Sequence, residues 1–191
     1  MLVSVNVGLP APLDTAKGRV LSAIAKRAVA GRVAVRALGL EGDAQADLAV
    51  HGGPEQAVYA YPHEHYAAWA EELGVAAGSA GFPPGWFGEN LTVRGALETD
   101  VRVGDTFRAG TALLQVTKPR SPCFKLAATM GRPDFATRFL ASGRTGFYLR
   151  VLTEGEVGSG DAFALVSRDE NAPTVLEDAR RRWGPPAARG G

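Results

Sequence analysis

The sequence of 191 residues has only one cysteine. A single thiol cannot close an intramolecular disulfide, so the cysteine content does not indicate an oxidising compartment. One cysteine is also too few to bind an iron–sulfur cluster. No stretch approaches the ~18 consecutive apolar residues of a membrane span. The first residues lack the basic start and long apolar run of a secretory signal. We therefore expect a soluble, cytoplasmic protein with no membrane partner.

The sequence also lacks an excess of basic residues. Lys and Arg total 21 against 20 Asp and Glu, a formal net charge of +1, whereas proteins that bind nucleic-acid polymers carry strong positive charge. The densest basic run, residues 180–182, is typical of a solvated helix face. The P-loop and the GxGxxG fingerprint are absent, as is strict βαβ alternation. These absences argue against a nucleic-acid partner and against a Rossmann fold.

Hydrophobic residues make up 46% of the chain, which suits a single domain that buries its own core. Residues 8–17 contain two prolines and are expected to form a loop, and residues 20–29 are ambiguous between strand and helix. Alternation of apolar and polar residues predicts short strands over residues 2–7, 33–38, 57–61, 91–93, 101–107, 112–116, 146–152 and 162–166. Helical patterns cover residues 62–73, 123–130, 135–140 and 173–183. Many short strands with helical insertions predict a mostly β, α+β domain of barrel-like form.

The clearest predicted helix runs from Pro62 to Leu73. Proline suits a first helical turn, Tyr66 and Trp69 share one apolar stripe, and Gly74 suits the helix C-terminus. Residues 63 and 65 are both histidines, but side chains two positions apart on a helix point in different directions. We therefore expect these histidines to pack and hydrogen-bond around the helix rather than to bind zinc together.

Cys123 lies in the segment Lys-Pro-Arg-Ser-Pro-Cys-Phe-Lys, where two prolines stiffen the chain before a helix. Exposed N–H groups at a helix start and the cations of Lys118, Arg120 and Lys125 are expected to lower the pKa of the thiol. A thiolate attacks electrophiles, carries sulfane sulfur or ligates a soft metal. A buried structural cysteine is the alternative interpretation.

Glycines and carboxylates are concentrated in residues 39–53. Glu41, Asp43 and Asp47, together with His51, could bind a hard metal or hydrogen-bond a polar heterocycle. The spacing matches no common metal motif, and a turn-rich loop in which the aspartates cap their own backbone is the alternative.

Three further polar residues are candidates for ligand contacts. The Asn90 carboxamide both donates and accepts, so it could read an amide or a pterin edge, or it could cap a local turn. Ser22 and Lys26 could hold a phosphate.

Taken in order, these segments resemble the MOSC family, named for the C-terminal domain of molybdenum cofactor sulfurase. The similarity is greatest to bacterial stand-alone members linked to resistance against N-hydroxylated purines such as 6-N-hydroxylaminopurine. The strongest match is Gln-Val-Thr-Lys-Pro-Arg-Ser-Pro-Cys-Phe-Lys-Leu at residues 115–126. The other matching segments are residues 22–26, 39–47, 50–53, 57–62, 64–66, 87–91, 103–105, 145–148 and 157–161.

The resemblance implies a MOSC domain over residues 1–168, of β-barrel-like form with helical insertions. Residues 169–191 would form a C-terminal helix and a disordered tail, whereas close family members extend into a small helical module. The family binds the molybdenum cofactor, a molybdenum–molybdopterin, with Cys123 as the metal ligand or as a persulfide carrier. The residues expected to hold the pterin and its phosphate, or to line their pocket, are Ser22, Lys26, Gly42, Asp43, His51, Gly52, Gly53, Asn90, Arg120, Ser121 and Lys125.

By this resemblance, the protein is expected to be an oxidoreductase that reduces N-hydroxylated compounds, such as hydroxylaminopurines and amidoximes, to amines. Because the sequence has no flavin fingerprint, electrons would come from a separate reductase partner; a homodimer is an open possibility. No pyridoxal phosphate is expected. Two alternatives remain: a cysteine-persulfide sulfur carrier for metal–sulfur cofactor assembly, and a non-catalytic module that binds the pterin or cofactor.

Overall fold

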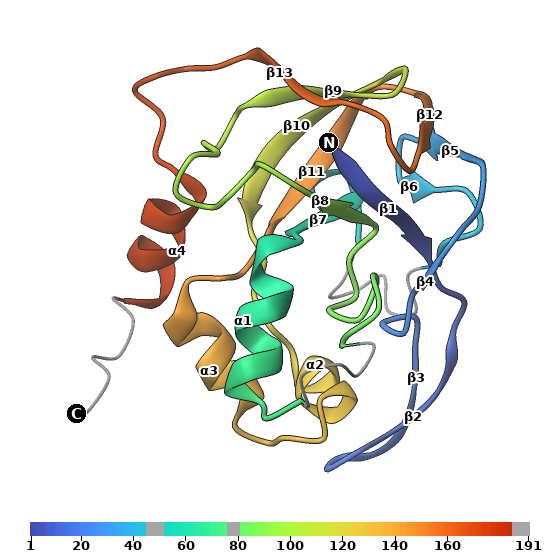
Figure 1. The fold of residues 1–191 in the computed structure, drawn as a ribbon, viewed down its shortest axis with the longest axis vertical. Coiled ribbons are helices and arrows are strands. Elements are labelled where there is room, and N and C mark those ends of the chain that lie inside the picture. The colour runs from blue at the N-terminus through green and yellow to red at the C-terminus, as the bar shows by residue number, and fades with distance from the viewer. Residues whose placement is uncertain (45–51, 76–80, 185–191) are drawn as a thin grey trace.

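A computed structural model describes residues 1–44, 52–75 and 81–184 (Figure 1). The helices are α1 (Glu64–Glu72), α2 (Phe124–Thr129), α3 (Phe135–Ser142), α4 (Val175–Trp183) and a short 3-10 turn, η1 (Pro54–Gln56). The strands are β1 (Leu2–Val7), β2 (Ala11–Thr15), β3 (Gly18–Ser22), β4 (Arg27–Ala28), β5 (Arg32–Arg36), β6 (Gly39–Leu40), β7 (Val58–Pro62), β8 (Leu91–Val93), β9 (Thr106–Ala109), β10 (Ala112–Pro119), β11 (Phe147–Thr153), β12 (Gly155–Gly158) and β13 (Phe163–Ser167). None of the helices in the described ranges is long and apolar enough to cross a membrane.

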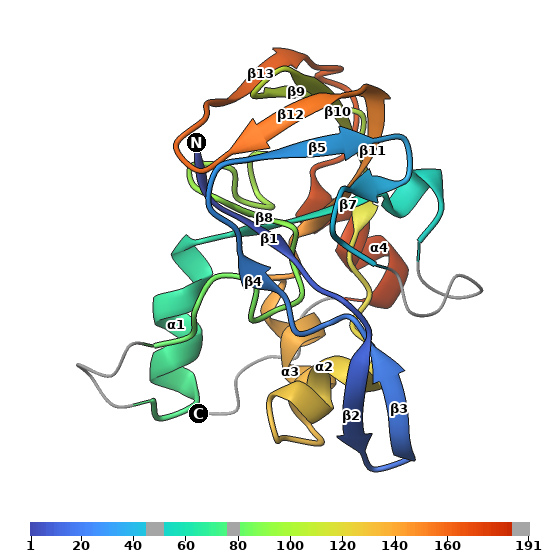
Figure 2. The same cartoon turned by 90° about the vertical axis from the view of Figure 1, so that its right-hand side faces the viewer.

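Eight of these strands form one sheet in the order β13-β9-β10-β11-β7-β8-β1-β4. Its neighbours are antiparallel, except for the parallel pair β7 and β8. A second sheet, β12-β5-β6, lies across the first, and one apolar core fills the space between them (Figure 2). Within the described residues, β13 and β4 are unpaired edges of this sheet, so the sheet does not close into a barrel. The predicted mostly β, α+β fold is confirmed, and its barrel-like form is open.

A second core lies on the helical side of the molecule, where α1, α2 and α3 gather beneath the strands (Figure 1). It is largely aromatic: Trp69 is fully buried and its ring stacks on Phe139 with centroids 6.1 Å apart. The indole Nε1 donates to the Tyr61 hydroxyl at 2.7 Å, which satisfies the polar end of a buried tryptophan. The predicted apolar stripe of α1 is therefore confirmed.

Three of the local predictions are wrong. The strand predicted over residues 101–107 begins only at Thr106 as β9, because residues 103–104 form a turn. Residues 11–15 form β2 rather than a loop, and pair with β3 in a hairpin that includes Pro12. A two-stranded ribbon consists of edge strands only, and an edge strand tolerates a residue without an N–H. Pro62 ends β7 instead of opening the helix, because its backbone pairs with Val93 of β8; α1 begins at Glu64.

The C-terminal helix agrees with its prediction. Thr174 and Glu177 form a reciprocal capping box at its start, and Val175 and Ala179 are buried against the rest of the molecule. This packing carries the last turn of α4 to the pocket region described below. Residues 185–191, expected to be disordered, lie outside the described part of the chain.

Candidate functional site

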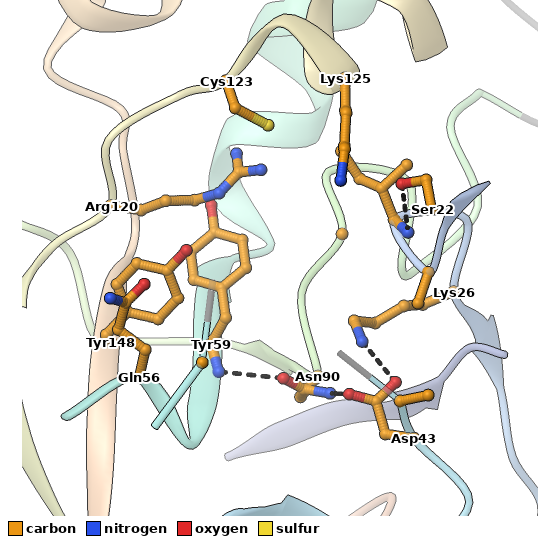
Figure 3. Close-up of a pocket in the computed structure, with 15 residues that line it drawn as sticks. Ser22, Lys26, Asp43, Gln56, Tyr59, Asn90, Arg120, Cys123, Lys125 and Tyr148 are labelled. Carbon is orange, nitrogen blue, oxygen red and sulfur yellow. Dashed lines mark hydrogen bonds and ion pairs between the residues drawn. The ribbon is translucent and has the colours of Figure 1, made fainter. Parts of the chain in front are cut away.

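One pocket gathers side chains from widely separated parts of the chain (Figure 3). Its walls come from the end of β3, the segment after β6, η1, β7, the segment before β8, the end of β10, α2 and β11. The lining residues are Ser22, Ala23, Ile24, Lys26, Asp43, Ala44, Gly52, Gln56, Tyr59, Gly88, Asn90, Arg120, Cys123, Lys125 and Tyr148.

Cys123 is half-buried and sits at the N-cap of α2 with extended backbone. The helix that follows has six residues, starting at Phe124, so the predicted helix start near the cysteine is confirmed. Figure 3 shows the Cys123 sulfur pointing towards the guanidinium of Arg120. Lys125, only 7% exposed, enters the same pocket from α2. The stiff segment after β10 thus places one thiol between two buried cations.

Arg120 is the most informative residue of the pocket. It is 5% exposed, and its guanidinium lies 4.8 Å from the Tyr59 ring centroid and 5.6 Å from that of Phe139. Its Nη1 is buried without a hydrogen-bond partner, and no carboxylate of the described residues pairs with it. A buried cation that lacks a counter-charge costs free energy, and a guanidinium matches phosphate and carboxylate geometry. The arrangement indicates an anionic ligand.

Burial and charge act in opposite directions on the groups around Arg120. Burial by itself lowers the pKa of the Arg120 guanidinium. The opposing effects of Tyr59, Tyr148 and Cys123 are larger together, so the pKa lies above its ordinary value and Arg120 stays charged. Burial also raises the pKa of Tyr59 and of Tyr148, against the opposing effect of the guanidinium. Both tyrosine hydroxyls therefore remain protonated at neutral pH, and the pocket keeps its positive charge.

Lys26, Asp43 and Asn90 form a connected polar clamp on the other side of the pocket. Asp43 pairs with the Lys26 ammonium and accepts hydrogen bonds from Asn90 Nδ2 at 2.8 Å and from the Gly8 N–H at 2.8 Å. The Asn90 Oδ1 accepts the N–H of Tyr59 at 3.1 Å. Burial lowers the pKa of Lys26 more than the Asp43 carboxylate raises it. Asn90 therefore holds Asp43 and β7 in place, and Asp43 orients the lysine.

Glu89, fully buried beside Asn90, anchors the loop that forms the pocket floor. Its carboxylate accepts hydrogen bonds from the Tyr66 hydroxyl, from the N–H groups of Gly85 and Phe87, and from the Thr92 hydroxyl. Burial raises the pKa of Glu89, and the Tyr66 hydrogen bond opposes that rise. With so many donors, Glu89 is a structural anchor rather than a group that is available to a ligand.

The structure brings together most of the predicted site. The predicted residues that line the pocket are Ser22, Lys26, Asp43, Gly52, Asn90, Arg120, Cys123 and Lys125. Gly42 and Gly53 are not among its lining residues, and Ser121 is exposed and faces an adjoining hollow. His51 and Asp47 lie outside the described residues.

Sequence reasoning missed Gln56, Tyr59 and Tyr148 as pocket residues. Tyr59 belongs to a segment whose alternation indicated only a strand, and Tyr148 lies 89 positions later. The two tyrosines are register partners in the pairing of β7 with β11, with ring centroids 5.4 Å apart. Only strand register identifies them as one wall of the pocket. No local signal marks Gln56.

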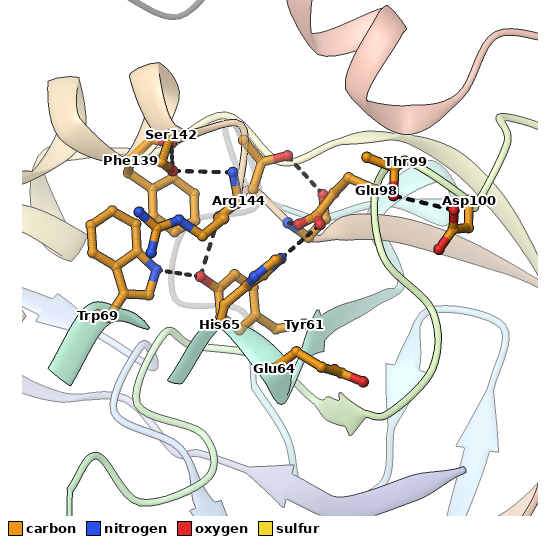
Figure 4. Close-up of polar contacts among 12 residues, drawn as sticks. Tyr61, Glu64, His65, Trp69, Glu98, Thr99, Asp100, Phe139, Ser142 and Arg144 are labelled. Carbon is orange, nitrogen blue, oxygen red and sulfur yellow. Dashed lines mark hydrogen bonds and ion pairs between the residues drawn. The ribbon is translucent and has the colours of Figure 1, made fainter. Parts of the chain in front are cut away.

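A separate polar cluster ties the helices to the sheet (Figure 4). Glu98 accepts the Gly146 N–H at 2.6 Å, and its other carboxylate oxygen lies 2.7 Å from His65 Nε2. The backbone carbonyl of Glu98 accepts the N–H of Leu176 in α4. His63 stacks on Tyr66. The packing and hydrogen-bonding role predicted for the two histidines is confirmed.

The donor set of the pocket fits an anionic, metal-bearing cofactor better than a metal bound by protein alone. Among the residues the structure describes, no group of three or more His, Cys, Asp or Glu side chains could hold a metal ion. Cys123 offers one soft sulfur ligand. The unpartnered Nη1 of Arg120 and the buried Lys125 offer positive charge to an anion. A metal here would need its remaining ligands from a cofactor.

Residues 47–164 match the sequence model of the MOSC domain. The chain belongs to the MOSC domain family. It is 42% identical over 174 residues to the uncharacterised protein YflK of Bacillus subtilis, an alignment that covers 91% of this chain and 76% of YflK. The crystal structure of YiiM from Geobacillus stearothermophilus superimposes with a TM-score of 0.77 at 37% identity, covering 95% of this chain and 83% of that one.

A third relative is longer. A Gibberella moniliformis protein named reductase is 36% identical over 171 residues, which cover 85% of this chain but only 29% of the fungal protein. This MOSC chain therefore corresponds to less than a third of that reductase.

Proposed function

We propose that this protein binds the molybdenum cofactor in the cationic pocket and reduces N-hydroxylated compounds to amines. The observation that carries the proposal is the placement of Cys123 beside Arg120, a buried cation with an unpartnered Nη1. The MOSC family of the chain and its similarity to a fungal protein named reductase support the same conclusion.

The residues of the pocket would divide the binding of the cofactor between them. Arg120 and Lys125 would pair with the phosphate and the pterin, with Lys26 as a third cation already oriented by Asp43. Cys123 would supply the protein's thiolate ligand. When bound, molybdenum would supply two-electron redox chemistry.

The overall reaction breaks one N–O bond: R–NHOH, two electrons and two protons give R–NH2 and H2O. The electrons would come from a separate reductase protein. Solvent would supply the protons, and the protonated hydroxyl of Tyr148 at the pocket wall would relay them.

Metal and pterin content test the proposal. Wild type and Cys123→Ser are expressed in a host that makes the cofactor, with Arg181→Ala on the exposed face of α4 as a matched control. Molybdenum is measured by mass spectrometry and pterin by fluorescence after oxidation. We expect near-stoichiometric molybdenum in wild type and the control, and its loss in Cys123→Ser. Preparations of wild type that lack both molybdenum and pterin would contradict the proposal, and sulfane sulfur on Cys123 would then favour a sulfur carrier.

A further inference from the structure

Residues 144–146, which lead into β11, hold Arg120 in place although none of them is among the lining residues of the cationic pocket. The Tyr59 hydroxyl donates to the carbonyl oxygen of Thr145 at 2.9 Å, and the Arg120 guanidinium lies 4.8 Å from the centroid of the same tyrosine ring. The Arg120 N–H donates to the carbonyl oxygen of Gly146 at 3.4 Å. The segment therefore fixes both the ring that supports the guanidinium and the backbone from which the Arg120 side chain extends.

Gly146 leaves no space between this segment and the aromatic wall. Its φ is +62°, and a Cβ added to it would lie 2.8 Å from Cε2 of Tyr59 and 2.8 Å from Cδ2 of Tyr61. The backbone thus lies directly against the ring that supports the guanidinium. Because protein interiors are close-packed and transmit displacements, a shift of Gly146 would move the Tyr59 ring and the Arg120 guanidinium with it.

Glu98 anchors the segment on the side away from the pocket (Figure 4). One of its carboxylate oxygens accepts the Gly146 N–H at 2.6 Å, and the other lies 2.7 Å from His65 Nε2. The Glu98 side chain is 4% exposed and that of His65 is 12% exposed, so loss of the carboxylate would leave a buried N–H without an acceptor. The carboxylate is itself held by α1, and it fixes the segment to a rigid element.

We propose that Glu98 is a positioning residue for Arg120, whose guanidinium it aims at an incoming anion through residues 144–146 and Tyr59. His65 in turn holds the Glu98 carboxylate. Among the residues that the structure describes, the buried Nη1 of Arg120 has no hydrogen-bond partner, so this donor is available to a ligand. A donor whose direction is set in advance loses less conformational freedom on binding. The inference deepens the proposed function and rests on it, because the anion is then the phosphate of the cofactor.

Binding of inorganic phosphate to the metal-free protein tests the inference. Calorimetric titrations at constant ionic strength give the phosphate Kd of wild type and of each variant. We expect Glu98→Ala to bind phosphate about fivefold more weakly, because a loosened guanidinium must be ordered on binding. Glu98→Gln keeps an oxygen that accepts the Gly146 N–H and should stay within about twofold of wild type. His65→Ala leaves the carboxylate without its holder and should lose about threefold.

Asp105→Ala is the matched control for a loss of stability. Asp105 is also a buried carboxylate that accepts a backbone N–H, that of Arg102, and pairs with a basic side chain, that of Arg168. It is not among the pocket residues. The control should lose stability but bind phosphate as wild type does, and an equal loss of phosphate affinity in Asp105→Ala and Glu98→Ala would overturn the inference. Circular dichroism shows whether each variant is folded, and His65→Ala takes the place of Glu98→Ala if the latter is not.

A double-mutant cycle shows whether the effect passes through Tyr59. Tyr59→Phe keeps the ring and removes the hydrogen bond to Thr145, so it should also weaken phosphate binding. We expect Glu98→Ala to cause little further loss of affinity in the Tyr59→Phe background, because both substitutions loosen the same seat. Losses that multiply would show two independent effects and would contradict the route from Glu98 to Arg120.

The outcome is separable from that of the proposed function. Wild type that binds phosphate but carries neither molybdenum nor pterin would contradict the proposed function, and the Glu98 variants would still decide the inference. Wild type that binds no phosphate at millimolar concentration would overturn the inference, as would an unchanged Kd in Glu98→Ala. In a host that makes the cofactor, Glu98→Ala should carry less pterin per protein than Asp105→Ala.

Discussion

At the scale of single residues, Arg120 differs from buried charges that are paired with a counter-charge. Asp105 is also buried, but the guanidinium of Arg168 pairs with it at 2.6 Å. Arg120 has aromatic faces and an open Nη1 instead of a carboxylate. Folding alone does not benefit from such a charge, so binding is the physical reason for it that the structure offers.

Replacing Arg120 by methionine should therefore separate binding from stability. We expect Arg120→Met to keep the free energy of unfolding or raise it by about 1 kcal/mol, because a buried unpaired charge is removed. Its molybdenum and pterin content should fall at least tenfold. Urea unfolding and cofactor analysis measure the two effects.

Arg144→Met is the matched control for this prediction. Arg144 pairs with Glu72, lies 4.1 Å from the Trp69 ring centroid and is not among the pocket residues. Its loss should lower stability without changing cofactor content. The reverse pattern in the two variants would show that Arg120 is a structural residue.

Lys26 predicts a pH dependence of stability. Burial lowers its pKa in the folded protein below the ordinary value of 10.5. Between the folded pKa and 10.5, the unfolded chain holds a proton that the folded protein has lost, so stability rises with pH. We expect the free energy of unfolding of wild type minus that of Lys26→Met to increase from pH 7 to pH 10.5, as measured by urea titrations. A constant or falling difference would contradict the lowered pKa.

At the scale of elements, the loop before β8 is packed closely against the segment that carries Lys26. Gly85 has a φ of +88°, and a Cβ added to it would lie 2.7 Å from the carbonyl oxygen of Lys26. Gly88 has a φ of +82°, and its added Cβ would lie 2.9 Å from Ile24 Cγ1. Only glycine adopts this backbone at no steric cost and allows so close an approach.

A pair of glycine variants isolates this contact. Gly95 also has a positive φ, of +76°, but no heavy atom lies within 4 Å of its added Cβ. We expect Gly95→Ala to lower the free energy of unfolding by about 1–2 kcal/mol through backbone strain alone. Gly85→Ala should cost about 1–3 kcal/mol more, because the added methyl group forces the two segments apart. Equal costs in urea unfolding would show that the close approach is unimportant.

At the scale of the whole molecule, Glu98 adds a polar link between the two cores. The core between the sheets and the aromatic core under the helices share β7 and β11, whose residues belong alternately to one core and the other. Glu98 connects them by binding His65 of α1, the Gly146 N–H before β11 and, through its carbonyl, Leu176 of α4. The link favours a single cooperative unit over two independent halves.

Glu98→Ala should thus weaken the molecule as a whole. We expect the variant to lose about 1–3 kcal/mol of unfolding free energy, because the buried Gly146 N–H and the His65 ring are left without their acceptor. Tryptophan fluorescence, which reports on Trp69, Trp86 and Trp183, should give the same midpoint as circular dichroism of the sheets. Thr99→Ala, next in the chain and exposed, should remain within about 0.5 kcal/mol of wild type. Separate midpoints for the two probes in wild type would contradict a single unit.

The sequence by itself determined the features that depend on neighbours in the chain. Alternation placed β1, and the apolar stripe placed α1. The cations and prolines around Cys123 singled it out as the candidate reactive thiol, and the ordered motifs indicated the family. These signals act over a few residues, where side-chain type and periodicity set the local conformation.

Only the tertiary structure decided how distant residues meet. The register of β7 with β11 makes one wall of Tyr59 and Tyr148, and β12, with two glycines among its four residues, becomes a strand only because β5 pairs with it. The Asn90 carboxamide forms hydrogen bonds with the Asp43 carboxylate and the Tyr59 N–H. Such contacts depend on strand register and on which buried polar group is left unpaired, and both are set by the packing of the whole chain.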